Sequence, residues 1–136
     1  MIDTARDVSH ELETDKYVRH VEGDIMKSDL ESMYDLVFMG NLIHHIPSEK
    51  IGDVFSKIFA HIKPKGKLVI WDFAEAEGKT ELVSSAFSLF FYITSGSKCY
   101  NRREIESFAS LAGFAKFSAR KPPTPSPHIL YIIGKE

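Results

Sequence analysis

The order of apolar and polar positions along the chain predicts alternating helices and strands. Apolar residues near the amino terminus recur at helical spacing, with acidic residues between them, so the chain is expected to begin inside an amphipathic helix. The apolar positions of this helix are Ile2, Ala5, Val8 and Leu12. Two strands are predicted next, YVRHVEG at residues 17–23 and YDLVFMG at residues 34–40.

Residues 34–73 read as one βαβ unit. The strand at 34–40 opens onto a polar loop, and a helix is expected at 48–62 with Ser48 as its N-cap. The apolar face of this helix consists of Ile51, Val54, Phe55, Ile58 and Ile62. The run KLVIWDF at 67–73 is almost continuously apolar, which is typical of a central parallel strand buried on both faces.

The last third of the chain predicts two helices and a hairpin. Residues 82–97 carry no charge but are shorter than the ~20 residues of a membrane-spanning helix, so they predict a buried helix. A second helix is expected at 101–112, with Gly113 as its C-cap. Strands at 114–121 and 128–135 flank the proline-rich loop PPTPSP and form a hairpin. The fold class is therefore α/β, a mostly parallel sheet with a carboxyl-terminal antiparallel hairpin and helices on both faces.

Composition narrows the classes of function. The chain has 136 residues, 43% of them hydrophobic, which indicates one globular domain over residues 1–136. A net charge of −2 gives no field to attract nucleic acid. The single cysteine, Cys99, cannot form an internal disulfide, and the charged amino terminus does not resemble a signal peptide. We expect a cytoplasmic protein without membrane or nucleic-acid partners.

Four segments in sequence order resemble the carboxyl-terminal portion of the class I S-adenosylmethionine-dependent methyltransferases. They are HVEGDIM at 20–26, YDLVFMGNLIHHIP at 34–47, HIKPKGKLVIWDF at 61–73 and YNRREIESFASLAGF at 100–114. Within that superfamily the chain looks most like the small-molecule O-methyltransferases, because the mostly uncharged stretch at 81–108 stands where they place part of the acceptor pocket.

The resemblance implies a set of cofactor-binding residues. Asp24 corresponds to the acidic residue near the adenine amino group, and Ile25 to the residue that packs on the adenine ring. Met39, Gly40 and Asn41 correspond to the segment that passes the methionine and sulfonium portion. Each position also has a simpler explanation, because Asp24 can cap a turn and Gly40 and Asn41 are common turn formers.

His44 is the candidate catalytic residue. It aligns with the histidine that acts as general base in plant-type O-methyltransferases, and imidazole titrates near neutrality, which suits it to take a proton from an acceptor hydroxyl. The chain departs from that pattern by having His45 and Ile46 where those enzymes have Asp and Trp. A packed, loop-stabilising histidine is the alternative. No metal site is predicted, since adjacent side chains in extended backbone point to opposite sides.

Two further features of this region leave alternatives open. The aromatic residues Phe87, Phe90, Phe91 and Tyr92 could form an apolar wall of an acceptor pocket, or belong to the core or to a subunit contact. Trp71 and Asp72 end their strand facing the predicted cleft, although Asp72 could only cap the following segment.

The glycine-rich turn that holds the cofactor in this family is absent, because none of the eight glycines forms a GxG arrangement. The resemblance therefore implies an amino-terminally truncated domain whose 34–40 strand has a bare edge. We expect the 17–23 strand to collapse onto that edge, or the edge to pair with another chain as a homo-oligomer or by domain swapping.

Two functions follow from these observations. The first is transfer of a methyl group from S-adenosylmethionine to a small, apolar or aromatic acceptor, which yields S-adenosylhomocysteine. The alternative is a cofactor-free methyltransferase remnant that acts as a binding or regulatory subunit.

Overall fold

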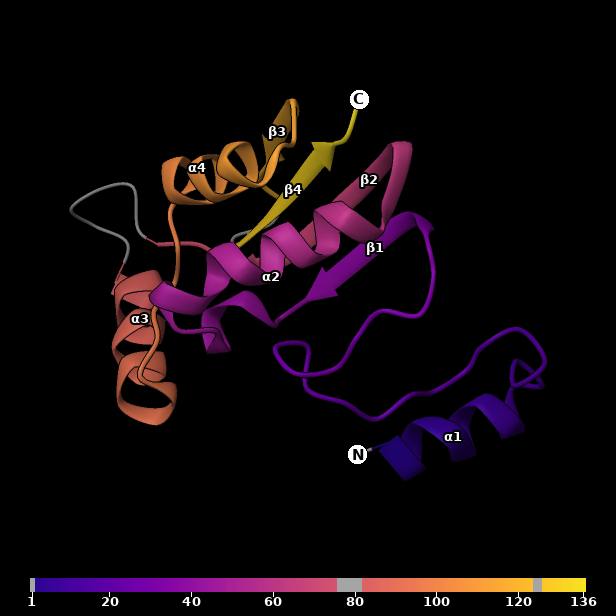
Figure 1. Cartoon of the computed structure of the whole chain (residues 1–136). Helices are drawn as coiled ribbons and strands as arrows, with labels where there is room; N and C mark the ends of the chain where they lie inside the picture. Colours follow the sequence, from indigo (N-terminus) through magenta and orange to yellow (C-terminus); the bar gives the residue numbers. More distant parts are fainter. Residues whose placement is uncertain (1, 76–81, 124–125) are drawn as a thin grey trace.

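The computed structural model describes residues 2–75, 82–123 and 126–136, and it contains a small mixed sheet with helices (Figure 1). In chain order the elements are α1 (Ile2–Glu11), β1 (Tyr34–Gly40), the 3₁₀ turn η1 (Ile43–His45), α2 (Ser48–His61), β2 (Ile62–Phe73), α3 (Leu82–Ser95), α4 (Arg102–Ala112), β3 (Lys116–Arg120) and β4 (His128–Gly134). The predicted α/β class, the βαβ unit and the carboxyl-terminal hairpin are confirmed.

The four strands lie in the order β1-β2-β4-β3. β1 pairs with β2 in parallel, whereas β4 pairs antiparallel with both β2 and β3. The sheet is thus mixed, with one parallel pairing among the described strands. The expectation of a mostly parallel sheet depended on a further strand at residues 17–23.

That further strand does not form, so its prediction was wrong. Residues 18–24 are irregular, and the apolar side chains of Val18 and Val21 are 45% and 65% exposed. Neither does this segment pair with β1, whose described ladder runs only to β2. A strand needs a neighbour for its backbone hydrogen bonds, and the described chain offers this segment none.

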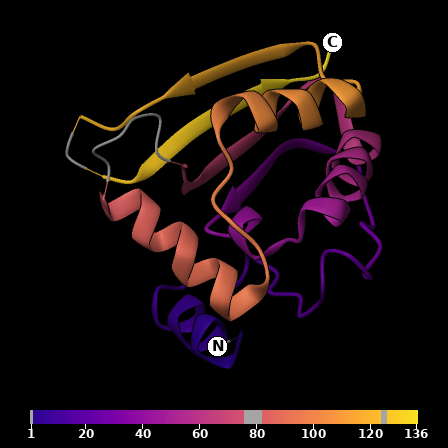
Figure 2. The ribbon, with the colours of Figure 1, turned by 90° about the vertical axis from the view of Figure 1, so that its left-hand side faces the viewer.

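The core lies between one face of the sheet and the pair of helices α2 and α4. β2 contributes Leu68 and Ile70 to this face, and β4 contributes Ile129, Tyr131 and Ile133, all of them buried. The predicted apolar face of α2 is buried against these residues, and α2 also packs against α4. Figures 1 and 2 show both helices on the same side of the strands.

On the opposite face of the sheet, the described helices reach only the end, where Phe87 and Phe91 of α3 contact Phe73. Leu36 and Phe38 of β1 point to that side and are 55% and 62% exposed. Val69 and Trp71 of β2 are half-buried there, so β2 is central but not buried on both faces as predicted. Of the helices expected on both faces, α2 and α4 cover one face and α3 meets the end of the other, whereas α1 extends away from the sheet (Figure 1).

The helix ends agree with the sequence at α4 and differ at α2. Asn101 and Glu104 form a capping box at the start of α4, and Gly113 ends the helix with a left-handed φ of 107°. Ser48 was predicted to cap α2, but the N-cap is Pro47, and Ser48 is the first helical residue. Its hydroxyl lies 3.4 Å from the hydroxyl of Tyr100, so it is engaged across the fold instead of along the helix.

Helix α3 is formed as predicted, but it is not a buried helix. Only Ser84 and Phe91 are buried, whereas Tyr92 and Ile93 are 68% and 73% exposed. The helix lies beyond the ends of β1 and β2, where it contacts η1 and the ring of Phe73 on β2 (Figure 1). None of the helices in the described ranges is long and apolar enough to cross a membrane.

Candidate functional site

The turn η1 follows β1 at the edge where the parallel strands β1 and β2 both end. In open α/β sheets this carboxyl edge is the usual position of a ligand. Asn41 makes the turn possible, because it adopts a left-handed φ of 50°, which asparagine tolerates better than most residues. The amide of Asn41 donates to the carbonyl of Trp71 at 2.9 Å, which ties the start of the turn to β2.

Asp72, near the end of β2, anchors η1 through hydrogen bonds to its side chain. Its side chain is fully buried, and Oδ2 accepts hydrogen bonds from the amides of Leu42 and Ile43, each at 2.8 Å. Its other oxygen, Oδ1, accepts from Nδ1 of His44 and from the amide of Phe73. One carboxylate therefore satisfies the first amides of the turn and orients its histidine, a role that goes beyond capping the segment after β2.

This pairing fixes the form of the His44 ring. Because the carboxylate can only accept, the hydrogen of the neutral imidazole must lie on Nδ1, and the lone pair then lies on Nε2. A proton taken up at Nε2 would give an imidazolium that faces a buried carboxylate. The imidazole thus presents a lone pair on Nε2 while its other nitrogen is held by Asp72.

Aromatic rings enclose His44. The ring of Phe91 on α3 stacks on the imidazole with centroids 3.8 Å apart, and Phe73 meets it edge-on at 5.3 Å. His44 is only 2% exposed as a result. The structure therefore agrees with the packed, loop-stabilising histidine and also gives the ring the partner that a base requires.

The far end of the turn is held by residues that sequence reasoning missed. The carbonyl of Ile46 accepts from the hydroxyls of Ser97 at 2.8 Å and Tyr100 at 2.7 Å, and both residues are buried. These bonds span more than fifty positions of the chain, so no local pattern signals them.

A second imidazole stands on the uncovered face of the same edge. Nε2 of His128 lies 3.0 Å from Oδ1 of Asn41, and its ring stacks on Trp71 with centroids 5.1 Å apart. Phe73 separates the rings of His128 and His44, since it contacts both. Desolvation lowers the pKa of His128, with the charge of His44 acting in the same direction and that of Asp72 opposing it.

The ring of His45 lies beside that of His44, with centroids 4.1 Å apart, but its hydrogen-bond partner is Ser95 and not Asp72. Its Nδ1 lies 3.0 Å from the hydroxyl of Ser95, and burial is the main cause that lowers its pKa. No group of three or more histidine, cysteine or acidic residues within the described ranges is placed to hold a metal ion.

The predicted adenine residues lie on a compact turn at residues 24–28. Oδ1 of Asp24 accepts from the amide of Met26 at 2.9 Å, and its backbone carbonyl accepts from the amides of Lys27 and Ser28. Asp24 is therefore a turn-capping residue, as the simpler explanation held. Its Oδ2 pairs with the exposed ammonium of Lys27 at 3.6 Å, and the Asp24 side chain is 40% exposed.

Ile25 and Met39 come together at one cavity. They line a hollow of about 280 Å³ beside β1, with Leu30, Tyr34, Val37 and Ile58 among the other walls. Gly40 and Asn41 follow Met39 and are exposed at the strand end. The walls of this cavity are mostly apolar, and Asp24 is not among the residues that line it.

The comparison with protein families decides the family. The model of the O-methyltransferase domain matches residues 1–115, a range that includes β1, η1, Asp72 and the 24–28 turn. The chain belongs to the O-methyltransferase family. The resemblance stated from the four sequence segments is confirmed.

Solved structures share the fold of this O-methyltransferase chain. A Nostoc punctiforme protein assigned provisionally as an O-methyltransferase matches with a TM-score of 0.90 at 24% identity over 98% of the chain. An O-methyltransferase family protein from Burkholderia thailandensis matches with a TM-score of 0.82 at 20% identity over 98%. Human N-acetylserotonin methyltransferase, in complex with S-adenosylmethionine, matches with a TM-score of 0.74 at 21% identity over 85% of the chain. At these identities the likeness shows a common fold.

The O-methyltransferase chain spans 41%, 40% and 33% of the lengths of these three structures. None of the curated proteins matches its sequence.

Proposed function

We propose that the chain contributes to S-adenosylmethionine-dependent methyl transfer onto a hydroxyl group of a small, apolar or aromatic acceptor, with His44 as the general base. The observation that carries this proposal is the buried His44–Asp72 pair at the shared end of β1 and β2, in a chain of the O-methyltransferase family.

The base role rests on where protons can go. Nδ1 of His44 donates to Asp72, so Nε2 is the atom that would take the acceptor hydroxyl proton. Asp72 would then face an imidazolium and stabilise it while keeping its own place under the turn. Hydrogen bonds from three backbone amides fix the Asp72 carboxylate, so the His44 ring needs no reorientation to act.

The residues that would hold the cofactor are those at the 24–28 turn and at the end of β1. Asp24 would accept from the adenine amino group, Ile25 would pack on the adenine ring, and Met39, Gly40 and Asn41 would lie along the methionine and sulfonium portion. Bound S-adenosylmethionine supplies an electrophilic methyl group on a sulfonium and leaves as S-adenosylhomocysteine.

Helix α3 would form the acceptor side of the site. Phe91 and Phe87 pack toward His44 and Phe73, and they offer an apolar surface to an aromatic acceptor. Few residues of α3 are buried, so this helix is the part of the site that can shift at low cost to admit an acceptor to His44.

The first test is calorimetric titration of the purified wild-type chain and of Asp24→Ala with S-adenosylhomocysteine. Asp29→Ala is the control, because it changes an exposed carboxylate outside the 24–28 turn. We expect affinity in the micromolar range that falls about tenfold or more in Asp24→Ala and not in Asp29→Ala.

The base is tested by methyl transfer to a panel of small phenols with His44→Gln and Asp72→Asn. We expect both variants to lose turnover while S-adenosylhomocysteine affinity stays within about twofold of wild type. A folded chain that binds no S-adenosylhomocysteine at millimolar concentration would overturn the proposal and favour the cofactor-free alternative.

A further inference from the structure

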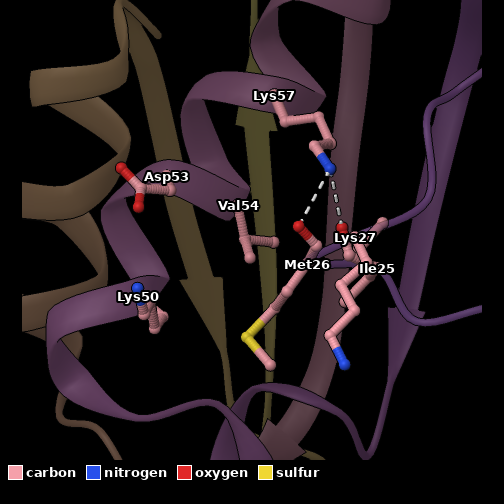
Figure 3. Close-up of a pocket in the computed structure, with 7 residues that line it drawn as sticks. All are labelled: Ile25, Met26, Lys27, Lys50, Asp53, Val54 and Lys57. Carbon is pink, nitrogen blue, oxygen red and sulfur yellow. Dashed lines mark hydrogen bonds between the residues drawn. The ribbon is translucent and has the colours of Figure 1, made fainter.

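The 24–28 turn is joined to helix α2 by one side chain. Nζ of Lys57 donates to the carbonyl oxygens of Ile25 at 3.0 Å, Met26 at 3.4 Å and Ser28 at 3.0 Å. Figure 3 shows the ammonium of Lys57 reaching from α2 to the first two of these carbonyls. Within the described ranges, Lys57 makes every hydrogen bond between α2 and the turn.

Ile25 is the residue of the turn that packs against the hydrophobic core. A cavity of about 260 Å³ separates the turn from α2, with Ile25, Met26 and Lys27 on one wall and Asp53 and Val54 on the other (Figure 3). The turn also lacks strand neighbours, because residues 18–24 are irregular. The three carbonyl bonds of Lys57 are therefore the polar connection between this turn and α2, beside the apolar packing of Ile25.

The internal bonds of the turn set its shape but not its position. Asp24 accepts from the amides of Met26, Lys27 and Ser28, and a Cβ at Gly23 would lie 2.6 Å from the Ser28 hydroxyl. The turn is compact, and these internal bonds do not tie it to α2 or to the sheet. Its position decides where the Asp24 carboxylate lies and whether Ile25 reaches the cavity that it shares with Met39.

We propose that Lys57 is a positioning residue for the cofactor, whose ammonium fixes the 24–28 turn so that Asp24 and Ile25 face the adenine. This inference rests on the proposed function for the identity of the ligand. The clamp itself rests on the three carbonyl contacts. Lys57 acts through the turn and does not touch the cofactor.

The test compares Lys57→Met and Lys57→Arg with wild type, and Lys50→Met serves as the matched control. Lys50 lies on the same helix and lines the same cavity, but it makes none of the three bonds. Two quantities are measured on each chain. They are the exchange rates of the amide hydrogens of Lys27 and Ser28, and the affinity for S-adenosylhomocysteine.

We expect Lys57→Met to raise both exchange rates about tenfold and to lower the affinity by a similar factor, while amides of β2 keep their wild-type rates. In Lys57→Arg we expect the exchange rates and the affinity to stay close to wild type, since arginine keeps a cation at the same place. Lys50→Met changes neither by more than about twofold.

Unchanged exchange at Lys27 and Ser28 in Lys57→Met would overturn the inference, and so would equal loss of affinity in Lys57→Met and Lys50→Met. Faster exchange throughout β2 would mean a general loss of stability and would also overturn it. If wild type binds no S-adenosylhomocysteine, the proposed function fails, and the cofactor role of Lys57 fails with it. The exchange rates would still decide whether Lys57 holds the turn.

Discussion

At the scale of single residues, Asp72 organises the site. The alignment with a known base histidine predicted His44, and the strand pattern placed Asp72 near the cleft. Their hydrogen bond joins residues 28 positions apart, so only the parallel pairing of β1 and β2 reveals it. His128 could not be predicted, because its contact with Asn41 spans 87 positions and depends on where β4 enters the sheet.

Asp72→Asn is expected to lower the free energy of unfolding by about 3 kcal/mol, because the amide cannot accept all four hydrogen bonds and places a donor where His44 also donates. Urea unfolding followed by circular dichroism measures the loss. The matched control is Asp35→Asn, an exposed carboxylate paired with Lys63, which should leave stability nearly unchanged. Equal midpoints for the two variants would contradict the assigned role of Asp72.

His128 and His45 predict a loss of stability in acid. Desolvation lowers the pKa of both in the folded state, so between that lowered pKa and the ordinary value of 6.5 the unfolded chain binds more protons than the folded chain. Their contribution is complete above pH 6.5 and is lost as the pH falls through the folded pKa.

Unfolding midpoints in urea, measured from about pH 7.5 to about pH 5, should therefore fall with pH, and less steeply in His128→Gln. His10→Gln is the control, because that ring is exposed on α1. An identical slope for wild type and His128→Gln would refute the contribution of His128.

At the scale of elements, periodicity predicted where helices and strands form but not how far they are buried. Residues 82–95 are helical, yet most of the helix is exposed, because burial depends on neighbours that the local sequence does not specify. The 17–23 segment has the composition of a strand, but within the described residues it pairs with no other strand. The ends of α4 could be predicted because a capping box and a terminal glycine are local features.

The two glycines Gly113 and Gly52 give a matched pair of helix substitutions. Gly113→Ala should lower the free energy of unfolding by about 1–2 kcal/mol, because the residue has a φ of 107° and a Cβ would lie 2.8 Å from the ring of Phe59. Gly52→Ala, inside α2 with nothing within 4 Å of the new Cβ, should raise it by about 0.5–1 kcal/mol. Thermal melts compare the two variants, and a change of the same sign in both would contradict the roles assigned to the two glycines.

At the scale of the whole molecule, the described sheet leaves much of one apolar face exposed and has two edge strands, β1 and β3. β1 lies at the edge of the described sheet, and Leu36 and Phe38 expose apolar surface next to its free backbone groups. Two copies could pair through this edge, with Leu36 opposite Phe38 of the second copy, which would bury both.

Phe38→Lys is therefore expected to weaken self-association about tenfold or more, because pairing would bury the new ammonium against apolar surface. Sedimentation equilibrium over a range of concentrations measures this. Leu111→Lys is the control, since Leu111 is 84% exposed on α4, away from β1. A wild-type chain that stays monomeric at all concentrations would rule out edge pairing.

The bonds to Ile46 have a consequence for folding. The carbonyl of Ile46 finds its hydrogen-bond donors only in Ser97 and Tyr100, which lie 51 and 54 positions later in the chain. The closure of such loops costs entropy that is recovered only when the distant contacts form, so η1 should acquire its final geometry late, after β1, α2 and β2 have associated. During refolding, the environment of His44 would then be among the last parts of the molecule to become native.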